Sequence, residues 1–291
     1  MKFEVKKVFV FLPLIAALAA CGGGGSDGES VNTNQGTTGG ASTGGSTGGA
    51  TGGSASGSTP LKETPAGSSG SVSAPFAVTP TSRYLLVGLG VNDYALVQTG
   101  VAQQADGAVV GIDDKTLTGD VAVQSISGDA TFAMGRWAQG FSTARAAGTQ
   151  ITRSEPGFHY IAFNRATFPS TGNYECDAGT FTAPTRTMGL GDIIGTAIGT
   201  GSVSFSPSGA TMKATILVRA NGDQSSTTAS NTFPLSSPDS AVKTANFSML
   251  GDGMLLALGA AQGNRVRLVV GYQVSVKNAD YRGIATFTCA P

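Results

Sequence analysis

The feature that most constrains the fold of this chain is an alternation of apolar and polar residues with a period of two. In the stretch RVRLVVGYQVSVK every second side chain from Val266 to Val276 is apolar, while Arg267 and Gln273 lie between them. Successive side chains of a β-strand point to opposite faces of the sheet, so this pattern predicts a strand with one buried and one solvent-facing side. The stretch ATMKATILVRA alternates in the same way.

Shorter stretches indicate further strands, and turn residues separate them. The expected strands include YLLVGLGV, FHYIAF, YECDAGTFTA, SVSFS and YRGIATFT, and the expected turns are SPSG, ANGD, GDG and QGN. The stretch DSAVKTANFSML suits either a short helix or a strand. Many short strands with regular turns are typical of antiparallel barrels and sandwiches. The sequence therefore predicts an all-β fold, an antiparallel barrel of about eight strands or a barrel-like sandwich, after a disordered Gly/Ser/Thr-rich linker.

The N-terminus has the features of a secretory signal that ends at a cysteine. Three lysines precede an apolar run over residues 8–20, which is too short to anchor the chain as a membrane-spanning helix. Leu-Ala-Ala stands directly before Cys21, an arrangement that resembles the lipobox of bacterial lipoproteins. That resemblance implies cleavage before Cys21, acylation of Cys21 and, because Gly22 follows in place of aspartate, sorting to the outer membrane. The alternative is an ordinary secretory signal with a chance cysteine.

Composition then divides the chain into a signal peptide (1–20), a lipidated N-terminus with a disordered linker (21–74) and a β-barrel domain (75–291). The linker is almost wholly Gly, Ser, Thr and Ala and has too little apolar surface to offset the entropy of ordering. As a flexible coil of about fifty residues it has an r.m.s. span of roughly 40 Å. The 18 basic and 18 acidic residues of the chain form no basic run, so nucleic acid is not an expected partner.

The chain has three cysteines, and their expected roles agree with an extracytoplasmic location. With Cys21 assigned to lipid, Cys176 and Cys289 remain, each on the less polar side of an expected strand. In an oxidising compartment a disulfide between them is the default, and two buried free thiols are the alternative. The closed loop is long, so the entropic model gives a stabilisation of about 5 kcal/mol. Neither cysteine has neighbours with the spacing of a metal site.

Catalytic arrangements are scarce in the sequence. His159 is the only histidine and lies inside the apolar strand FHYIAF, and no serine occupies a G-x-S-x-G elbow. Asp113 and Asp114 lie in an expected turn, and the glycine-rich stretches lack dinucleotide-loop spacing. In GLGDIIGTAIGTG the isoleucines are expected to cover a barrel mouth. We therefore expect a non-enzymatic protein with no catalytic residue, metal or cofactor; an envelope hydrolase that depends on His159 is the least favoured alternative.

Four residues are candidate ligand contacts. Arg136 and Trp137 are adjacent, and both residue types are favoured anchors in binding sites. Because neighbouring strand residues face opposite ways, the favoured interpretation places Trp137 in the core and Arg136 in solvent. His159 and Tyr160 are the local pair to test if haem or iron is bound, although their adjacency argues against both serving one site.

The lipobox, the glycine-rich linker and the β-rich C-terminal part together resemble the transferrin-binding-protein-like surface lipoproteins of Gram-negative bacteria. The most similar stretches are GTGSVSFSPSGATMKATILV and GTFTAPT after NYEC, which resemble that family's barrel hairpins. The chain differs from larger members in having one compact domain instead of two lobes, and no ligand-contact residue matches.

The resemblance implies an eight-stranded barrel displayed at the outer membrane that binds a host protein or a small nutrient. We thus expect a lipid-anchored cell-envelope binding protein, held to the membrane through its N-terminal lipid and exposed on the cell surface. A structural or assembly lipoprotein on the periplasmic face is the alternative.

Overall fold

The computed structural model describes residues 69–235, 242–243 and 251–291, and all of them belong to the compact unit Leu61–Pro291. The expected signal peptide, the lipid-attachment residue Cys21 and most of the expected linker lie outside the described residues, as does most of DSAVKTANFSML. The described residues form nineteen strands and no helix, which confirms the predicted all-β class. Among them there is accordingly no helix long and apolar enough to cross a membrane.

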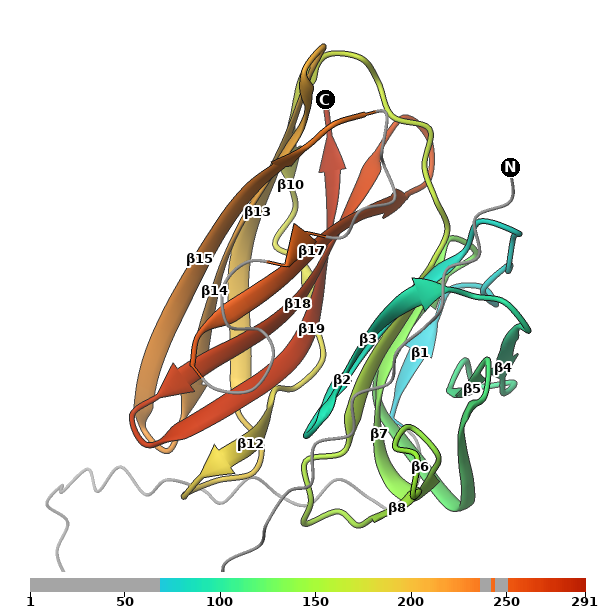
Figure 1. Ribbon diagram of the computed structural model, residues 1–291, viewed down its shortest axis with the longest axis vertical. Coiled ribbons are helices and arrows are strands. Elements are labelled where there is room, and N and C mark those ends of the chain that lie inside the picture. Colours follow the sequence, from blue (N-terminus) through green and yellow to red (C-terminus); the bar gives the residue numbers. More distant parts are fainter. Residues whose placement is uncertain (1–68, 236–241, 244–250) are drawn as a thin grey trace, which may run out of the picture. The chain divides into compact units, whose positions relative to one another are not determined.

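The first sheet is built from the N-terminal part of the described chain and curves into a half-barrel (Figure 1). Its strands follow the order β3-β2-β9-β7-β6-β5-β4, with β8 paired to β7 and β1 paired to β6. All of these pairs are antiparallel except β1 with β6. The bounds are β1 Gly70–Val72, β2 Arg83–Gly88, β3 Val91–Leu96, β4 Val101–Gln103, β5 Val109–Ile112, β6 Lys115–Asp129, β7 Phe132–Ser142, β8 Thr149–Ile151 and β9 Phe158–Phe163.

The second sheet is antiparallel and curls into a nearly closed barrel. Eight strands follow one another in the order β15-β14-β13-β10-β19-β18-β17-β16, and β11 and β12 pair with β19. Figure 1 shows β13, β14 and β15 on one side of this barrel and β17, β18 and β19 on the other. The bounds are β10 Gly172–Cys176, β11 Thr180–Phe181, β12 Thr185–Gly189, β13 Thr196–Ser206, β14 Gly209–Ala220, β15 Asp223–Phe233, β16 Val242–Lys243, β17 Gly253–Ala260, β18 Val266–Val276 and β19 Ala279–Ala290.

The sequence predicts one barrel, and the structure has an eight-strand barrel path preceded by a separate half-barrel. Strand pairing is already present before residue 75, because β1 pairs with Ile126–Gly128 of β6. At Gly70 the two strands approach so closely that an added Cβ would lie 2.3 Å from the Ile126 carbonyl oxygen, and Val72 packs against the half-barrel core. A composition of glycine and serine therefore does not mark where the linker ends.

Apolar side chains are buried in three groups, one inside each sheet and one between the two sheets. The barrel encloses the alternating apolar residues of β14 and β18, as the sequence predicts. The group between the sheets comprises Leu85, Val87, Phe132, Met134, Ile161, Phe163, Leu255, Ala257, Val269 and Ile284.

The predicted solvent-facing side of β18 is wrong at Arg267 and Gln273, whereas Arg265 and Lys277 at the two ends of the stretch are exposed. Arg267 and Gln273 are only 4% and 0% exposed, because their face of β18 packs against the half-barrel. Arg267 pairs with Asp129 at 3.4 Å, and its guanidinium lies 3.6 Å from the centre of the Phe132 ring. These two polar residues of β18 thus lie in the buried layer between the two sheets instead of in water.

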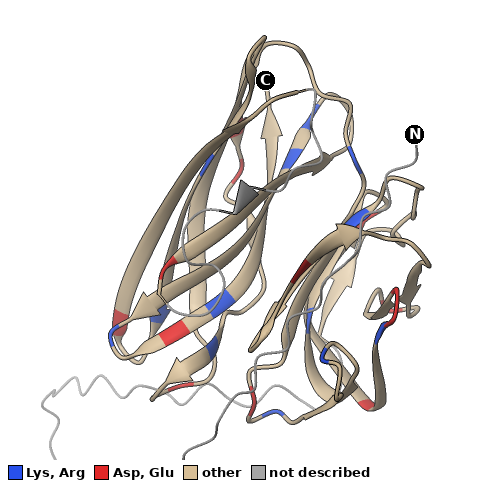
Figure 2. Ribbon diagram, in the orientation of Figure 1, with Lys and Arg blue, Asp and Glu red and all other residues tan. Residues whose placement is uncertain are grey.

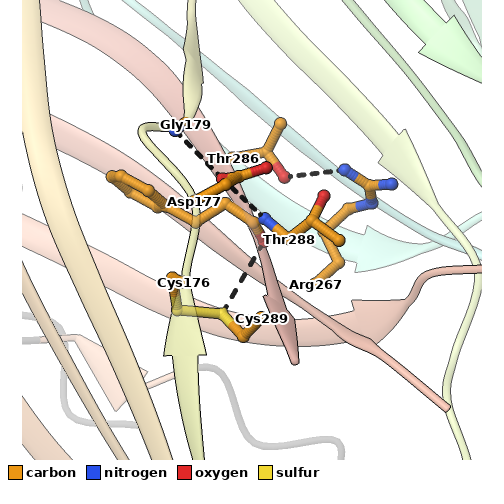
Figure 3. The surroundings of a disulfide bond; sticks show 8 residues. Cys176, Asp177, Gly179, Arg267, Thr286, Thr288 and Cys289 are labelled. Atoms are coloured by element: carbon orange, nitrogen blue, oxygen red, sulfur yellow. Dashed lines mark hydrogen bonds between the residues drawn. A yellow bond between two sulfur atoms is a disulfide. The ribbon is translucent and has the colours of Figure 1, made fainter. Parts of the chain in front are cut away.

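The predicted disulfide between Cys176 and Cys289 is present (Figure 3). The two residues are directly opposed on β10 and β19, with their Cα atoms 3.9 Å apart. Beside the bond, the Asp177 carboxylate accepts hydrogen bonds of 3.0 Å from the backbone N–H groups of Gly179 and Thr288. These contacts fasten the turn after β10 to the last strand.

Candidate ligand-binding site

A pocket of about 1000 Å³ lies where β6, β7 and β8 of the half-barrel approach the segment that leads into β13. Concave sites of about 300–1,000 Å³ are typical of small-molecule binding. Its walls include Gln124, Arg136, Ile151, Arg153, Ile193 and Ile194. Three smaller pockets have volumes of about 400, 240 and 520 Å³. The charged side chains among their lining residues are exposed or half-buried. Of these four pockets, therefore, only the large one contains a buried charge.

That buried charge is Arg136, whose side chain is only 2% exposed. Its Nη2 donates a hydrogen bond to the Gln124 side-chain oxygen, and its Nε has no hydrogen-bond partner among the described residues. None of the ion pairs between described residues includes Arg136. Burial lowers the pKa of Arg136 to about 10, because no neighbouring carboxylate offsets the loss of hydration. The expectation that Arg136 faces solvent is wrong, because the second sheet covers that face.

Arg267 provides a contrast within the same layer. Burial also lowers its pKa to about 10, but Asp129 opposes the shift and accepts a hydrogen bond from the guanidinium. Of these two deeply buried arginines, therefore, only Arg136 has no counter-ion among the described residues.

Trp137 and Tyr160 lie on the opposite face, inside the half-barrel, as predicted for Trp137. Their ring centres are 6.1 Å apart. The Trp137 Nε1 donates to the Val109 carbonyl at 2.7 Å, and the Tyr160 hydroxyl accepts from the Val109 N–H at 3.1 Å. Burial raises the pKa of Tyr160. Both side chains are fully buried and fix β5 in place, and neither lines the pocket.

His159 is fully buried between the sheets. Its two ring nitrogens lie 2.8 Å from the hydroxyls of Thr182 and Thr185. The Thr182 hydroxyl donates to the Ile284 carbonyl at 3.3 Å, so it accepts from His159 Nδ1–H, and Nε2 then accepts from Thr185. Desolvation first, and then the charges of Arg136 and Arg282, hold the pKa of His159 well below its usual value. A neutral histidine with both nitrogens occupied ties β9 to the segment around β11 and β12.

Arg282 completes this polar layer between the sheets. Its Nη1 donates to the Gly88 carbonyl at 2.8 Å and its Nε donates to the Gln273 side-chain oxygen. Gln273 in turn donates to the Gly251 carbonyl at 2.7 Å. Burial lowers the pKa of Arg282 as well. The region around His159 therefore carries positive charge.

The remaining sequence candidates have structural roles. Asp113 and Asp114 lie in the predicted turn, where Asp113 accepts bonds of 2.8 Å from the backbone N–H groups of Gln98 and Thr99, and Asp114 pairs with Lys115. His159 and Tyr160 point into different layers and do not share a site. In residues 69–235, 242–243 and 251–291 no three His, Cys, Asp or Glu side chains are grouped so that they could hold a metal. Charges of both signs are scattered over the two sheets, and neither sign gathers into a continuous face (Figure 2).

The pocket contains residues that the sequence did not single out. Gln124, Ile151 and Arg153 carry no local motif, and the pairing of β6 and β8 with β7 brings them into one wall. Of the isoleucines expected at a barrel mouth, Ile193 and Ile194 line this pocket instead, whereas Ile198 is 55% exposed. Comparison with known proteins finds no matching family model, no matching curated protein and no matching solved structure.

Proposed function

We propose that this chain is a lipid-anchored binding protein of the bacterial cell envelope that holds a small ligand in the pocket around Arg136. The observation that carries the proposal is a buried guanidinium that has no counter-ion within the described part of the chain and lies in the wall of a pocket of about 1000 Å³. A buried, unpaired charge destabilises a fold by several kcal/mol, so its presence in a pocket is a signature of function.

Binding is favoured over catalysis by the surroundings of His159. The only histidine is fully buried, and both of its nitrogens are engaged by threonine hydroxyls, so it has no access to a substrate proton. His159 does not line the pocket, and the one carboxylate in the pocket wall, Asp120, accepts a hydrogen bond from Gln139.

The anchor and the outer-membrane location are supported by the sequence around Cys21 and by the long Gly/Ser/Thr-rich stretch after it. The resemblance to transferrin-binding-protein-like lipoproteins is supported by the eight-strand path of the second sheet. Metabolic labelling of the full chain with alkyne-palmitate tests the anchor. We expect incorporation that Cys21→Ala abolishes, and unlabelled wild-type protein would refute it. Protease treatment of intact cells then separates surface display, where the domain is removed, from a periplasmic location, where it is spared.

A neutral fluorescent dye tests the pocket independently of charge. The probe is prodan, added to residues 22–291, which retain the whole compact unit Leu61–Pro291. We expect a blue-shifted, enhanced emission that Thr196→Trp reduces, because Thr196 is exposed and lines the pocket. Thr200→Trp, two residues beyond Ile198 on the same exposed face of β13, is the matched control and leaves the signal unchanged. Equal emission from both variants would remove the pocket as the site.

A further inference from the structure

The charged residues in the pocket wall are Asp120, Arg136 and Arg153, so cations outnumber carboxylates by two to one. The single carboxylate is already engaged. Gln139 donates to Asp120 and accepts a bond of 2.9 Å from Arg153 Nε, which links these three side chains along the rim. Asp120 and Arg153 are exposed, whereas Arg136 is buried. The rim is therefore internally compensated, and the excess positive charge belongs to Arg136.

The contacts of Arg136 leave part of its binding capacity unused. A guanidinium offers five N–H donors in a planar fork that matches the two oxygens of a carboxylate. One hydrogen bond to the neutral Gln124 amide is made, and the Nε is unsatisfied. Leaving a buried donor without a partner is unfavourable, and for a charged donor the penalty is larger. An anionic acceptor would supply both the missing hydrogen bond and the counter-ion.

The uncharged residues of the pocket wall indicate the chemistry of the rest of the ligand. Ala138, Ile151, Ala183, Ile193 and Ile194 form an apolar lining around the charge. A fully hydrated dianion such as phosphate would meet one buried arginine and several aliphatic side chains, which is too little charge to replace its hydration. A single carboxylate attached to an aliphatic body satisfies both parts of the wall.

We propose that the pocket binds a small amphipathic monocarboxylate, with the carboxylate on Arg136 and the aliphatic body against Ile151, Ile193 and Ile194. The inference rests on the proposed function, since it names the ligand class of the same pocket. The arginine and the apolar wall line one cavity, and because the Arg136 Nε is shielded from solvent, the carboxylate reaches it only when the guanidinium turns toward that cavity.

Calorimetric titration of residues 22–291 with octanoate and with octanamide isolates the charge, because the two compounds differ mainly in the head group. We expect octanoate to bind at least about tenfold more tightly than octanamide, a difference that one charge-assisted contact readily supplies. Equal binding of the two compounds, or no binding of octanoate at millimolar concentration, would overturn the inference.

Two variants assign the effect to Arg136. Arg136→Met removes the charge, and Gln124→Glu places an internal carboxylate against the same guanidinium, so each should abolish the preference for octanoate. Arg219→Met is the matched control, since Arg219 is exposed on β14 outside the pocket, and it should titrate as wild type. Octanoate preference that persists in both pocket variants would refute the role of Arg136.

The experiments distinguish a failure of the carboxylate preference from a failure of the ligand pocket itself. Binding of prodan that Thr196→Trp blocks, together with no preference for octanoate, would leave a ligand pocket and remove only the carboxylate. Absence of both prodan and octanoate binding would remove the pocket function itself.

Discussion

Arg136 on β7 and His159 on β9 are directly opposed residues of the half-barrel, and both side chains are buried in the layer that faces the second sheet. A cation thus lies beside an imidazole that cannot easily gain a charge. The neighbouring Arg282 acts in the same direction, and together with burial these charges keep His159 neutral. The charge of Arg136, the proposed ligand contact, therefore also contributes to the low pKa of His159 and so to the pH dependence of stability.

The depressed pKa of His159 predicts a loss of stability in mild acid. The unfolded chain takes up a proton near pH 6.5 and the folded chain does not, so stability is full above that pH and falls below it. We expect the free energy of unfolding to drop by about 2 kcal/mol between pH 7 and 5. His159 is the only histidine, so urea unfolding at several pH values reads this effect directly.

His159→Gln is the control for the pH experiment. It removes the titrating group, so its unfolding free energy should be lower overall but nearly independent of pH over the same range. A wild-type protein whose stability is flat from pH 7 to 5 would contradict the depressed pKa.

Gln124→Glu should stabilise the ligand-free protein while it abolishes octanoate binding. The introduced carboxylate supplies the counter-ion that Arg136 lacks, and we expect a gain of about 1 kcal/mol because an ion pair adds Coulombic attraction to a bond in which only the guanidinium is charged. Thermal unfolding at pH 7 measures the gain, which should be lost progressively as the pH falls below about 4, because the guanidinium lowers the pKa of the introduced carboxyl in the folded state and protonation then removes the pair. A decrease in stability at pH 7 would show that Arg136 is already compensated.

The disulfide should account for a large share of the stability. Cys176 and Cys289 are separated by 113 residues, and opening a loop of that length costs up to about 5 kcal/mol on the chain-entropy model. We expect the double variant Cys176→Ala/Cys289→Ala to unfold at much lower denaturant concentration than wild type. In residues 22–291 these are the only cysteines, so thiol titration should find none before reduction and two after it. Two free thiols in the untreated protein would refute the bond.

Two tyrosines lie over glycines on neighbouring strands, one pair in each sheet. Tyr160 is opposed to Gly135 and Tyr272 to Gly283. A Cβ at Gly135 would lie 2.4 Å from the Tyr160 hydroxyl oxygen, and one at Gly283 would lie 2.3 Å from that of Tyr272. Each ring covers the strand where a side chain is missing.

Gly135→Ala and Gly283→Ala should therefore each lower the free energy of unfolding by about 1–3 kcal/mol, because a buried tyrosine must move. Ser226→Ala, at an exposed position of β15, is the control and should change stability by less than about 0.5 kcal/mol. Wild-type stability of both glycine variants in chemical denaturation would show that the rings can shift freely.

Local pattern predicted much of the strand content. FHYIAF corresponds to β9, and the alternating stretches around Met212 and Leu268 became β14 and β18 with their apolar faces inside the barrel. The cysteine pairing was also predictable, because the compartment and the small number of thiols left few alternatives. The strands follow from the alternation of neighbouring residues, and the disulfide follows from the number of cysteines, so neither prediction requires knowledge of the tertiary contacts.

The candidate site was predictable only in one residue, Arg136, and even there its environment was misassigned. Alternation with a period of two assigns side chains to two faces, but it does not say whether the polar face meets water or another sheet. The packing of the half-barrel against the barrel decided that Arg136, Arg267 and Gln273 are buried, and it created the pocket from residues far apart in the chain. The sequence by itself determined the strands and the disulfide, whereas the burial of the polar faces and the site they form arise from long-range sheet packing, which no local pattern encodes.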